Sequence, residues 1–311
     1  MQSLVVFAGP DIVSHLVLRR LVMFCRTHGL LLRVKFPTAH LEFSKHTHRV
    51  QEYLRLERTY LYEARKTELK RLRDNGYLTL QWDVDVNSPE LHSQVRALDL
   101  FAAVNLRGYQ KFRPQTIDVF WGLGTPLMNL HPGLLPDYRG LFSTFWVMRD
   151  HQPHIGCTLH EIDADYDTGP IIESARIHID SNYSVLGNVL RLAGIAELLL
   201  VNEFQRRLNG RTRSNQMQRE GGHYWSTPPK SDVQRIEQSG EVSLVNIDED
   251  RQLIRRLVRE CPEDQFRSIV PADEIPASPY AGAETASRST MHRQKLRQSQ
   301  LAESVRSSEE P

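Results

Sequence analysis

The fold class is decided near the start of the chain, by the stretch Leu4-Val-Val-Phe-Ala-Gly-Pro-Asp-Ile-Val-Ser-His-Leu-Val-Leu-Arg-Arg-Leu-Val-Met-Phe-Cys-Arg26 and the residues that follow it. Two short apolar runs, Leu4–Ala8 and Leu30–Phe36, predict buried strands. The longer amphipathic run Ile12–Arg26 predicts a helix that stops at Gly29. Because parallel neighbouring strands need a crossover connection, this order predicts a parallel β-sheet.

The same alternation continues through the first two-thirds of the chain. It predicts a fold of the α/β class, with a mainly parallel, twisted sheet flanked by helices. Ligands of such sheets bind outside the carboxyl ends of the strands, so chemistry is expected in the loops that follow strands. The further strands are expected at Tyr77–Gln81, Leu98–Asn105, Pro126–Leu130, Gly156–Ile162 and Pro170–Ile179, and the further helices at Val50–Arg73, Ser88–Arg96, Pro114–Phe120, Leu141–Asp150 and Val185–Leu208.

The character of the sequence changes after the helix expected at Val185–Leu208. We predict a main domain over residues 1–208, an appended polar segment over 209–270 and a disordered tail over 271–311. The tail cannot bury enough apolar surface to offset the chain entropy that folding would cost. In the appended segment, a helix is expected around Gln252–Glu260 and strand-like runs at His223–Ser226 and Val242–Val245. Tyr224 and Trp225 either anchor this segment or form a lid.

Composition and charge exclude several classes of protein. The 311 residues include 39 Lys and Arg against 38 Asp and Glu, so a global basic surface that holds nucleic acid or an anionic membrane is excluded. No apolar run approaches the roughly 18 to 20 residues that cross a bilayer, and no charged segment precedes the first apolar run, as a secretory signal would require. The three cysteines, Cys25, Cys157 and Cys261, are odd in number and far apart, which favours a reducing, cytoplasmic location.

One candidate site follows the strand expected at Pro126–Leu130, in the loop Leu127-Met-Asn-Leu-His-Pro-Gly-Leu-Leu-Pro-Asp-Tyr-Arg-Gly140. Asn129 and His131 share a face of an extended chain, because side chains at i and i+2 point the same way. A carboxamide and an imidazole side by side can donate hydrogen bonds to an oxyanion that develops as a carbonyl is attacked.

A second candidate loop lies in Gly156-Cys-Thr-Leu-His-Glu-Ile-Asp-Ala-Asp-Tyr-Asp-Thr-Gly-Pro-Ile-Ile172. Asp163, Asp165 and Asp167 alternate there, but the glycine and the final glutamate of a calcium loop are missing. Taken alone, the loop is also compatible with a plain polar hairpin turn. His151, His154 and His160 are interpreted as surface or hydrogen-bonded histidines and not as a metal site.

The two loops together resemble the catalytic domain of the folate-dependent formyltransferases. The resemblance rests on Asn129-Leu-His-Pro-Gly-Leu-Leu-Pro-Asp-Tyr-Arg-Gly140, on Gly156–Asp163 and on Asp167-Thr-Gly-Pro-Ile-Ile172, and it covers roughly residues 1–205. It implies a Rossmann-like fold and a cytoplasmic, biosynthetic transferase of one-carbon groups, which uses 10-formyltetrahydrofolate and no metal. Members of the family include glycinamide ribonucleotide transformylase, methionyl-tRNA formyltransferase and the formyltransferases of amino sugars and of hydroxyornithine.

The resemblance also implies roles for individual residues. Asn129, His131 and Asp167 match the catalytic trio of the family. By their placement, the cofactor-binding candidates are Arg107, Gly108, Tyr109, Ala164, Asp165 and Tyr166. Three stretches depart from the family pattern: Ala8-Gly9-Pro10 lacks the glycine-rich phosphate turn, Gly133 stands where many members carry Ser, and Leu106-Arg-Gly-Tyr-Gln-Lys-Phe112 is unusual for a strand end that lines a pterin.

From the resemblance we expect formyl transfer to an amine of a small molecule, either an amino sugar nucleotide or an amino acid of the hydroxyornithine type. Methionyl-tRNA is less favoured, since residues 209–311 do not predict the C-terminal β-barrel of the tRNA enzyme. A formyltetrahydrofolate hydrolase is also less favoured, because no regulatory domain precedes the first strand, and so is a binding subunit without catalysis. No membrane or nucleic-acid partner is expected, and the protein can be a monomer or a homodimer.

Overall fold

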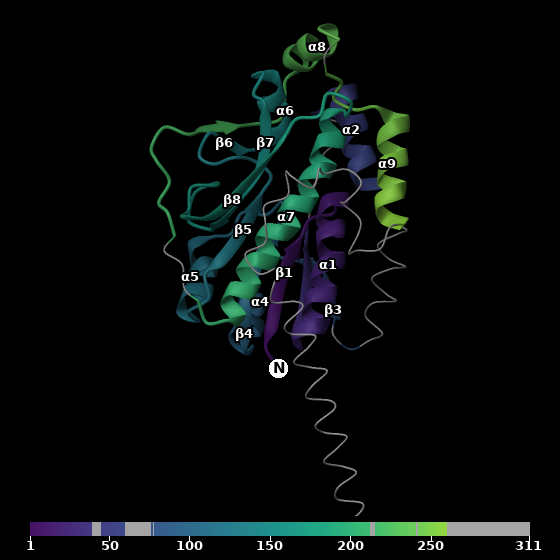
Figure 1. Ribbon diagram of the computed structural model, residues 1–311. Helices are drawn as coiled ribbons and strands as arrows, with labels where there is room; N and C mark the ends of the chain where they lie inside the picture. Colours follow the sequence, from purple (N-terminus) through teal and green to yellow (C-terminus); the bar gives the residue numbers. More distant parts are fainter. Residues whose placement is uncertain (39–44, 60–75, 77, 212–214, 241, 260–311) are drawn as a thin grey trace, which may run out of the picture.

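The protein folds around one seven-stranded sheet (Figure 1). The structure is a computed structural model, and it describes residues 1–38, 45–59, 76, 78–211, 215–240 and 242–259. The strand order is β3-β2-β1-β4-β5-β7-β8. The strands are β1 (Ser3–Ala8), β2 (Leu31–Pro37), β3 (Leu78–Val84), β4 (Leu100–Leu106), β5 (Leu127–His131), β7 (His154–Glu161) and β8 (Ile171–His178).

The pairing of the strands confirms the predicted mainly parallel α/β sheet. The five strands β1 to β5 pair in parallel, and crossover helices connect them as the strand–helix order requires. β7 and β8 are antiparallel, because only the loop of residues 162–170 joins them. This loop returns to the carboxyl edge of β5, and it brings Asp167 there.

Helices cover both faces of the sheet. α1 packs beside α7 on one face of the sheet (Figure 1). Leu4 and Val6 of β1 belong to the apolar core on this face. Val5 and Phe7 alternate to the opposite face and pack against α4 and α5. The helices of this main body are α1 (Ile12–His28), α2 (His48–Thr59), α4 (Pro89–Arg96), α5 (Pro114–Gly122), α6 (Ser143–Arg149) and α7 (Val185–Leu208).

The α7 helix has the bounds that the sequence predicts. Ser184 caps its first turn by accepting a hydrogen bond from the Gly187 backbone N–H at 2.9 Å. By length and composition alone α7 is apolar enough to cross a membrane, but 83% of its most apolar window is buried inside the protein. It is therefore the long core helix that closes one face of the sheet.

The segment after residue 208 packs against the main body. β9 (His223–Trp225) pairs in parallel with the short strand β6 (Tyr138–Gly140), and α9 (Ile247–Arg259) packs against α2 and α7. A further helix, α8 (Lys230–Gln238), is not predicted by the sequence. The division of the chain at residue 208 stays a prediction, and the predicted tail over 271–311 and the second half of the helix at Val50–Arg73 lie outside the described residues.

One predicted element of this segment is wrong. Val242–Val245 has the apolar alternation of a strand, but the structure has no strand there in the described residues. The carbonyl oxygens of Ser243 and Leu244 instead accept hydrogen bonds from the Val185 and Leu186 backbone N–H groups. The run thus provides acceptors for the free N–H groups in the first turn of α7, and it does so without pairing with a strand.

Candidate active site

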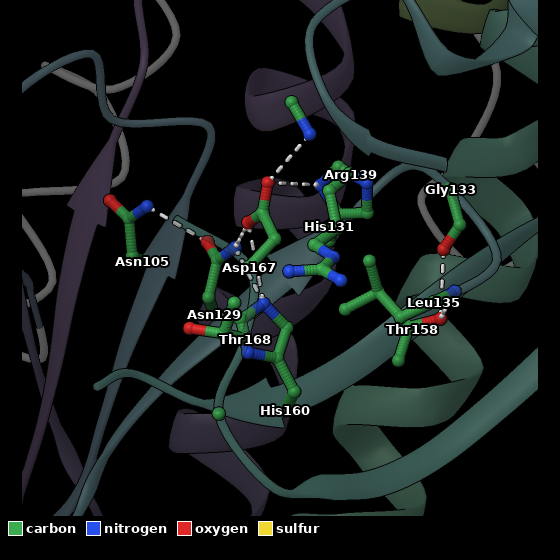
Figure 2. A network of polar contacts seen from close by, with 12 residues as sticks. Asn105, Asn129, His131, Gly133, Leu135, Arg139, Thr158, His160, Asp167 and Thr168 are labelled. Atoms are coloured by element: carbon green, nitrogen blue, oxygen red, sulfur yellow. Dashed lines mark hydrogen bonds and ion pairs between the residues drawn. The ribbon is translucent and has the colours of Figure 1, made fainter. Parts of the chain in front are cut away.

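The candidate site lies at the carboxyl edge of β4 and β5, beside the end of β7. The register of the strands sets Asn129 of β5 between Asn105 of β4 and His160 of β7. Asp167 reaches the same place from the loop between β7 and β8. Figure 2 shows its carboxylate between the side chains of Asn129, His131 and His160. The structure therefore brings together the three residues predicted as the catalytic trio.

The Asp167 carboxylate is the centre of this polar network. Oδ1 accepts a hydrogen bond from Asn129 Nδ2 at 3.2 Å, and Oδ2 accepts one from the Gly140 backbone N–H at 2.9 Å. His131 Nδ1 and His160 Nε2 each lie 3.5 Å from a carboxylate oxygen. Burial alone disfavours the charged form, but the two histidines and the Gly140 N–H prevail and hold the pKa of Asp167 well below its usual value. The carboxylate is ionised at neutral pH.

The loop that carries Asp167 is held in one shape. Asp167 has a positive φ of 55°, which Asp tolerates better than most residues. Gln218 Nε2 donates to the carbonyl oxygens of Asp167 at 2.9 Å and of Gly169 at 2.8 Å. A Cβ added at Gly169 would collide with the Glu161 carbonyl oxygen, so only glycine allows the loop to return so close to β7.

The carboxamide of Asn129 is fixed by its neighbours. Asn105 Nδ2 donates to Asn129 Oδ1 at 2.9 Å, and Asn105 Oδ1 accepts from the Gly108 backbone N–H at 3.1 Å. The NH2 group of Asn129 is thereby turned toward Asp167 and toward His160 Nε2, which lies 3.0 Å away. The sequence does not single out Asn105, which is only the last residue of an expected strand.

The imidazole of His131 is buried and oriented from both sides. Nε2 lies 2.6 Å from the Tyr138 carbonyl oxygen and 3.3 Å from Ser143 Oγ, so it carries the proton and donates it to the carbonyl. Nδ1 faces Asp167. Burial lowers the pKa of His131, although the Asp167 carboxylate and the Tyr138 carbonyl favour the charged ring. His131 is therefore neutral at pH 7, with an Nδ1 that can accept a proton next to a carboxylate.

Gly133 is required for this arrangement. A Cβ added there would lie 2.6 Å from His131 Nε2, 2.6 Å from the Tyr138 carbonyl oxygen and 2.8 Å from Ser143 Oγ. A serine would therefore not fit at position 133 in this structure. The hydroxyl next to His131 comes from Ser143, at the start of α6.

His160 is a site residue that the sequence interpretation missed. The interpretation as a hydrogen-bonded strand histidine is right about Nδ1, which donates to the Glu161 carbonyl oxygen at 2.8 Å. Nε2 points into the site, 3.0 Å from Asn129 Nδ2 and 3.5 Å from Asp167 Oδ1. The signal that could have found His160 is its place opposite Asn129 across two antiparallel strands, which the sequence does not reveal.

A cavity of about 340 Å³ opens beside the trio, and Asn129, His131 and Asp167 line it. Of the predicted cofactor-binding residues, Arg107, Gly108, Tyr109, Asp165 and Tyr166 also line it, but Ala164 does not. Lys111, at the end of the strand-end loop, and Tyr224, which the sequence suggests as an anchor or a lid, line it as well, and so do Phe112 and Ile162, which the sequence does not indicate. Lys111 Nζ lies 4.7 Å from the centre of the Tyr166 ring, and the rings of Tyr166 and Tyr224 are 5.8 Å apart. The cavity thus has a flat, partly apolar wall and one polar end.

The three acidic residues of the loop do not converge on one point. Asp163 Oδ1 accepts a hydrogen bond from Thr168 Oγ1 at 2.7 Å, and Asp167 is engaged by the network described above. Among the residues that the structure describes, no group of three or more His, Cys, Asp or Glu side chains could hold a metal ion. The side chains of the trio can supply hydrogen bonds and move protons.

Comparisons with known proteins agree with this geometry. Residues 74–195 match a family model described as formyl transferase. A GDP-perosamine N-formyltransferase of Brucella melitensis is 42% identical over 53 residues, which are 17% of this chain and 20% of the relative. A methionyl-tRNA formyltransferase of Thermosynechococcus vestitus is 34% identical over 116 residues, 36% of this chain and 33% of the relative. The matched segments thus span a third or less of these relatives.

A solved structure supports the fold over a longer stretch. A sugar N-formyltransferase from a Shewanella species superposes with a TM-score of 0.51 over 82% of this chain and 88% of its own, at 16% sequence identity. At that identity the likeness concerns the fold alone. The family match adds the residues from 74 to 195, which include the whole trio and the strands that position it. Residues 74–195 of this chain are thus similar to the formyl transferase family, and most of the chain shares the fold of a sugar N-formyltransferase.

Proposed function

We propose that the protein is a cytoplasmic N-formyltransferase that moves a formyl group from 10-formyltetrahydrofolate to the amine of an amino sugar carried on a nucleotide. The observation that supports this most directly is the position of the Asp167 carboxylate. It lies 3.2 Å from Asn129 Nδ2 and 3.5 Å from His131 Nδ1, at the polar end of a cavity large enough for a flat ring.

The first step is attack of the amine nitrogen on the formyl carbon, which turns the carbonyl oxygen into an oxyanion. Asn129 Nδ2–H donates a hydrogen bond to this oxygen in place of its contact with Asp167 Oδ1 or His160 Nε2. His131 Nδ1 takes up the proton of the amine, donates a second hydrogen bond to the oxygen and then passes the proton to N10. One such donor contributes about 3 kcal/mol to the stability of the transition state. The bond between the formyl carbon and N10 of the folate then breaks, and N10 takes up the proton that the amine has lost.

Proton movement depends on Asp167 and His131. Because the pKa of Asp167 is held well below its usual value, the carboxylate is present to attract the proton of the attacking amine. His131, which burial keeps neutral, receives positive charge on Nδ1 next to that carboxylate. Proton transfer by positioned groups of this kind accelerates reactions by about 10²–10⁴-fold.

The folate co-substrate fits the larger cavity. Phe112, Ile162 and Tyr166 supply flat or apolar surface for a pterin ring, and the backbone between Arg107 and Lys111 supplies peptide groups for its polar edge. The folate brings the activated formyl group to the trio. Among the predicted cofactor-binding residues, Ala164 does not line this cavity and is left out of the proposal.

Two features of the fold disfavour other acceptors, and the name of one relative favours an amino sugar. Asp11 caps α1 by accepting a hydrogen bond from the Ser14 backbone N–H at 3.0 Å. An anion therefore already occupies this helix N-terminus, which disfavours a phosphoribosyl acceptor there. After residue 208, β9 is the one strand that the described residues form, and a β-barrel that binds tRNA needs several. The perosamine enzyme of Brucella acts, by its name, on an amino sugar.

The experiment that tests the proposal is incubation with 10-formyltetrahydrofolate and one amine at a time. The amines are GDP-perosamine, hydroxyornithine and methionyl-tRNA, and tetrahydrofolate formation is followed by absorbance. We expect turnover with the nucleotide-linked amino sugar, lost in Asp167→Asn and kept in Asp118→Asn, which removes an exposed acid on α5. Turnover without any amine would identify a hydrolase. Absence of both turnover and folate binding would refute the proposal.

A further inference from the structure

A second cavity, of about 190 Å³, adjoins the larger one. The two cavities share Arg107, Tyr109, Leu141 and Phe142 as a common wall. The far side of the second cavity comes from Tyr53 and Glu57 of α2 and from Thr227. It is smaller than the usual site for a drug-sized ligand, so it suits one ring more than a whole nucleotide.

Two buried polar atoms, on side chains that line this cavity, have no hydrogen-bond partner among the described residues. Glu57 is fully buried, and its Oε1 pairs with Arg107 Nη2 at 2.7 Å, but its Oε2 is without a partner. Arg107 Nη1 is likewise buried without a partner. A fold rarely leaves a charged donor and a charged acceptor unsatisfied, unless an ordered water or a ligand completes them.

The charges around these atoms do not favour an anionic ligand. Arg107 is paired not only with Glu57 but also with the buried Asp11, whose Oδ1 lies 3.7 Å from Arg107 Nε. A phosphate or carboxylate would therefore meet the carboxylates of Glu57 and Asp11 beside the guanidinium groups of Arg107 and Arg58, with no excess of positive charge to hold it. A hydroxyl group suits both unsatisfied atoms, because it can donate to Glu57 Oε2 and accept from Arg107 Nη1.

The remaining wall is aromatic. The rings of Tyr53 and Phe142 lie 5.2 Å apart, and the Tyr109 ring is stacked under the guanidinium of Arg58 at 4.8 Å. Flat apolar faces of this kind can pack against the C–H face of a ring whose edge carries hydroxyl groups.

We propose that the second cavity binds the hydroxylated ring of the amine acceptor, with Glu57 and Arg107 hydrogen-bonded to one or two of its hydroxyl groups. The ring lies against Tyr53 and Phe142. Its amine extends past Tyr109, which borders both cavities, into the larger cavity next to Asp167. This inference rests on the proposed function, since it names where the sugar of that acceptor binds. It also assigns Arg107 to the acceptor, whereas the sequence suggests a role in folate binding.

The test is the variant Glu57→Gln, with Glu52→Gln as its control. Glu52 lies on the same helix and pairs with Arg49, away from the cavity. Binding of GDP-perosamine is measured by calorimetry without a formyl donor, and its KM is measured in the formyl-transfer assay. For Glu57→Gln we expect Kd and KM to rise by about tenfold, as loss of one hydrogen bond to a charged group predicts. The Kd of folinic acid stays unchanged in both variants.

Thr227→Tyr provides a second variant, because it fills the cavity from a partly exposed position and leaves the buried pair of Glu57 and Arg107 intact. We expect Thr227→Tyr to raise the Kd and KM of GDP-perosamine as well. This variant decides the question if Glu57→Gln does not fold. Acceptor binding that depends on Glu57 without any formyl transfer would support this inference and refute the proposed function. Transfer with unchanged KM in Glu57→Gln and Thr227→Tyr would refute this inference alone. Failure of the unmodified protein to bind GDP-perosamine would also refute it.

Discussion

Asn105 donates a hydrogen bond from Nδ2 to Oδ1 of Asn129, across two neighbouring parallel strands, at 2.9 Å. The bond decides which end of the Asn129 carboxamide faces Asp167. If the amide were turned over, its oxygen would face the Asp167 carboxylate and no N–H would be available to an oxyanion. Asn105 is itself oriented by the Gly108 backbone N–H, so the loop that lines the larger cavity also sets the direction of Asn129.

The first prediction concerns this positioning bond. In Asn105→Asp the new carboxylate can still accept from the Gly108 N–H, but it cannot donate to Asn129 Oδ1. We expect kcat to fall by about tenfold, the value of one hydrogen bond to a group that must be oriented, while the Kd of folinic acid and the melting temperature stay close to those of the unmodified protein. An unchanged kcat in a folded variant would show that Asn129 needs no such support.

The second prediction concerns the carboxylate itself. Asp167→Asn keeps the size of the side chain and removes the charge beside His131 Nδ1. Because the variant can neither attract the proton of the amine nor stabilise a charged His131, kcat should fall by about 10²–10⁴-fold. The control is Asp118→Asn, and single-turnover formyl transfer measures the effect. A rate within the range of the control would remove Asp167 from the mechanism.

The sequence predicts the sheet well, because periodicity is a local property. The apolar runs of β1, β2 and β4 and the bounds of α7 are recognisable within windows of a few residues. The shared face of Asn129 and His131 follows from the same period of two, and the structure places both beside Asp167. The presence of Asp167 at this point follows only from the family resemblance, since alternation in its loop favours Asp163 and Asp165 equally.

What the sequence does not predict depends on contacts between distant parts of the chain. Asn105, Asn129 and His160 meet through strand register, which no single strand encodes. The pairing of β6 with β9 joins segments about eighty residues apart, and Trp146 Nε1 donates to the Ser226 carbonyl oxygen over a similar separation. Likewise, Glu57 is one of many charged residues in a helix whose sequence suggests solvation, and its burial arises only when α2 packs over Arg107.

The third prediction concerns the glycine behind Asp167. A Cβ at position 169 would collide with the Glu161 carbonyl oxygen, so Gly169→Ala must displace the loop and move Asp167 away from His131. Gly122→Ala is the matched control, because nothing lies within 4 Å of a Cβ there. We expect Gly169→Ala to lower kcat by about 10²-fold or more, as small misplacements of catalytic groups do, and Gly122→Ala to leave it unchanged. Equal rates in the two variants would contradict the rigidity of the loop.

The fourth prediction concerns stability, at the contact between α9 and the start of α7. Asp250 is buried and accepts hydrogen bonds from Ser184 Oγ and from the Asn246 backbone N–H, each at 2.8 Å. Burial nevertheless raises the pKa of Asp250 from 3.8 to about 6. The folded state therefore binds this proton more tightly than the unfolded state does, and the resulting stability is lost as pH rises from about 4 through 6.

Replacement of Asp250 by Asn removes this titration, so the comparison of the two proteins isolates it from all other groups. The shift of about two pKa units predicts that, between pH 4.5 and pH 7.5, the unfolding free energy of the unmodified protein falls by about 2 kcal/mol relative to Asp250→Asn. Asn keeps one acceptor for Ser184 or Asn246, so the variant should remain folded. Urea unfolding at the two pH values measures the difference. A constant difference, or one of opposite sign, would mean that Asp250 ionises in the folded protein as easily as in the unfolded chain.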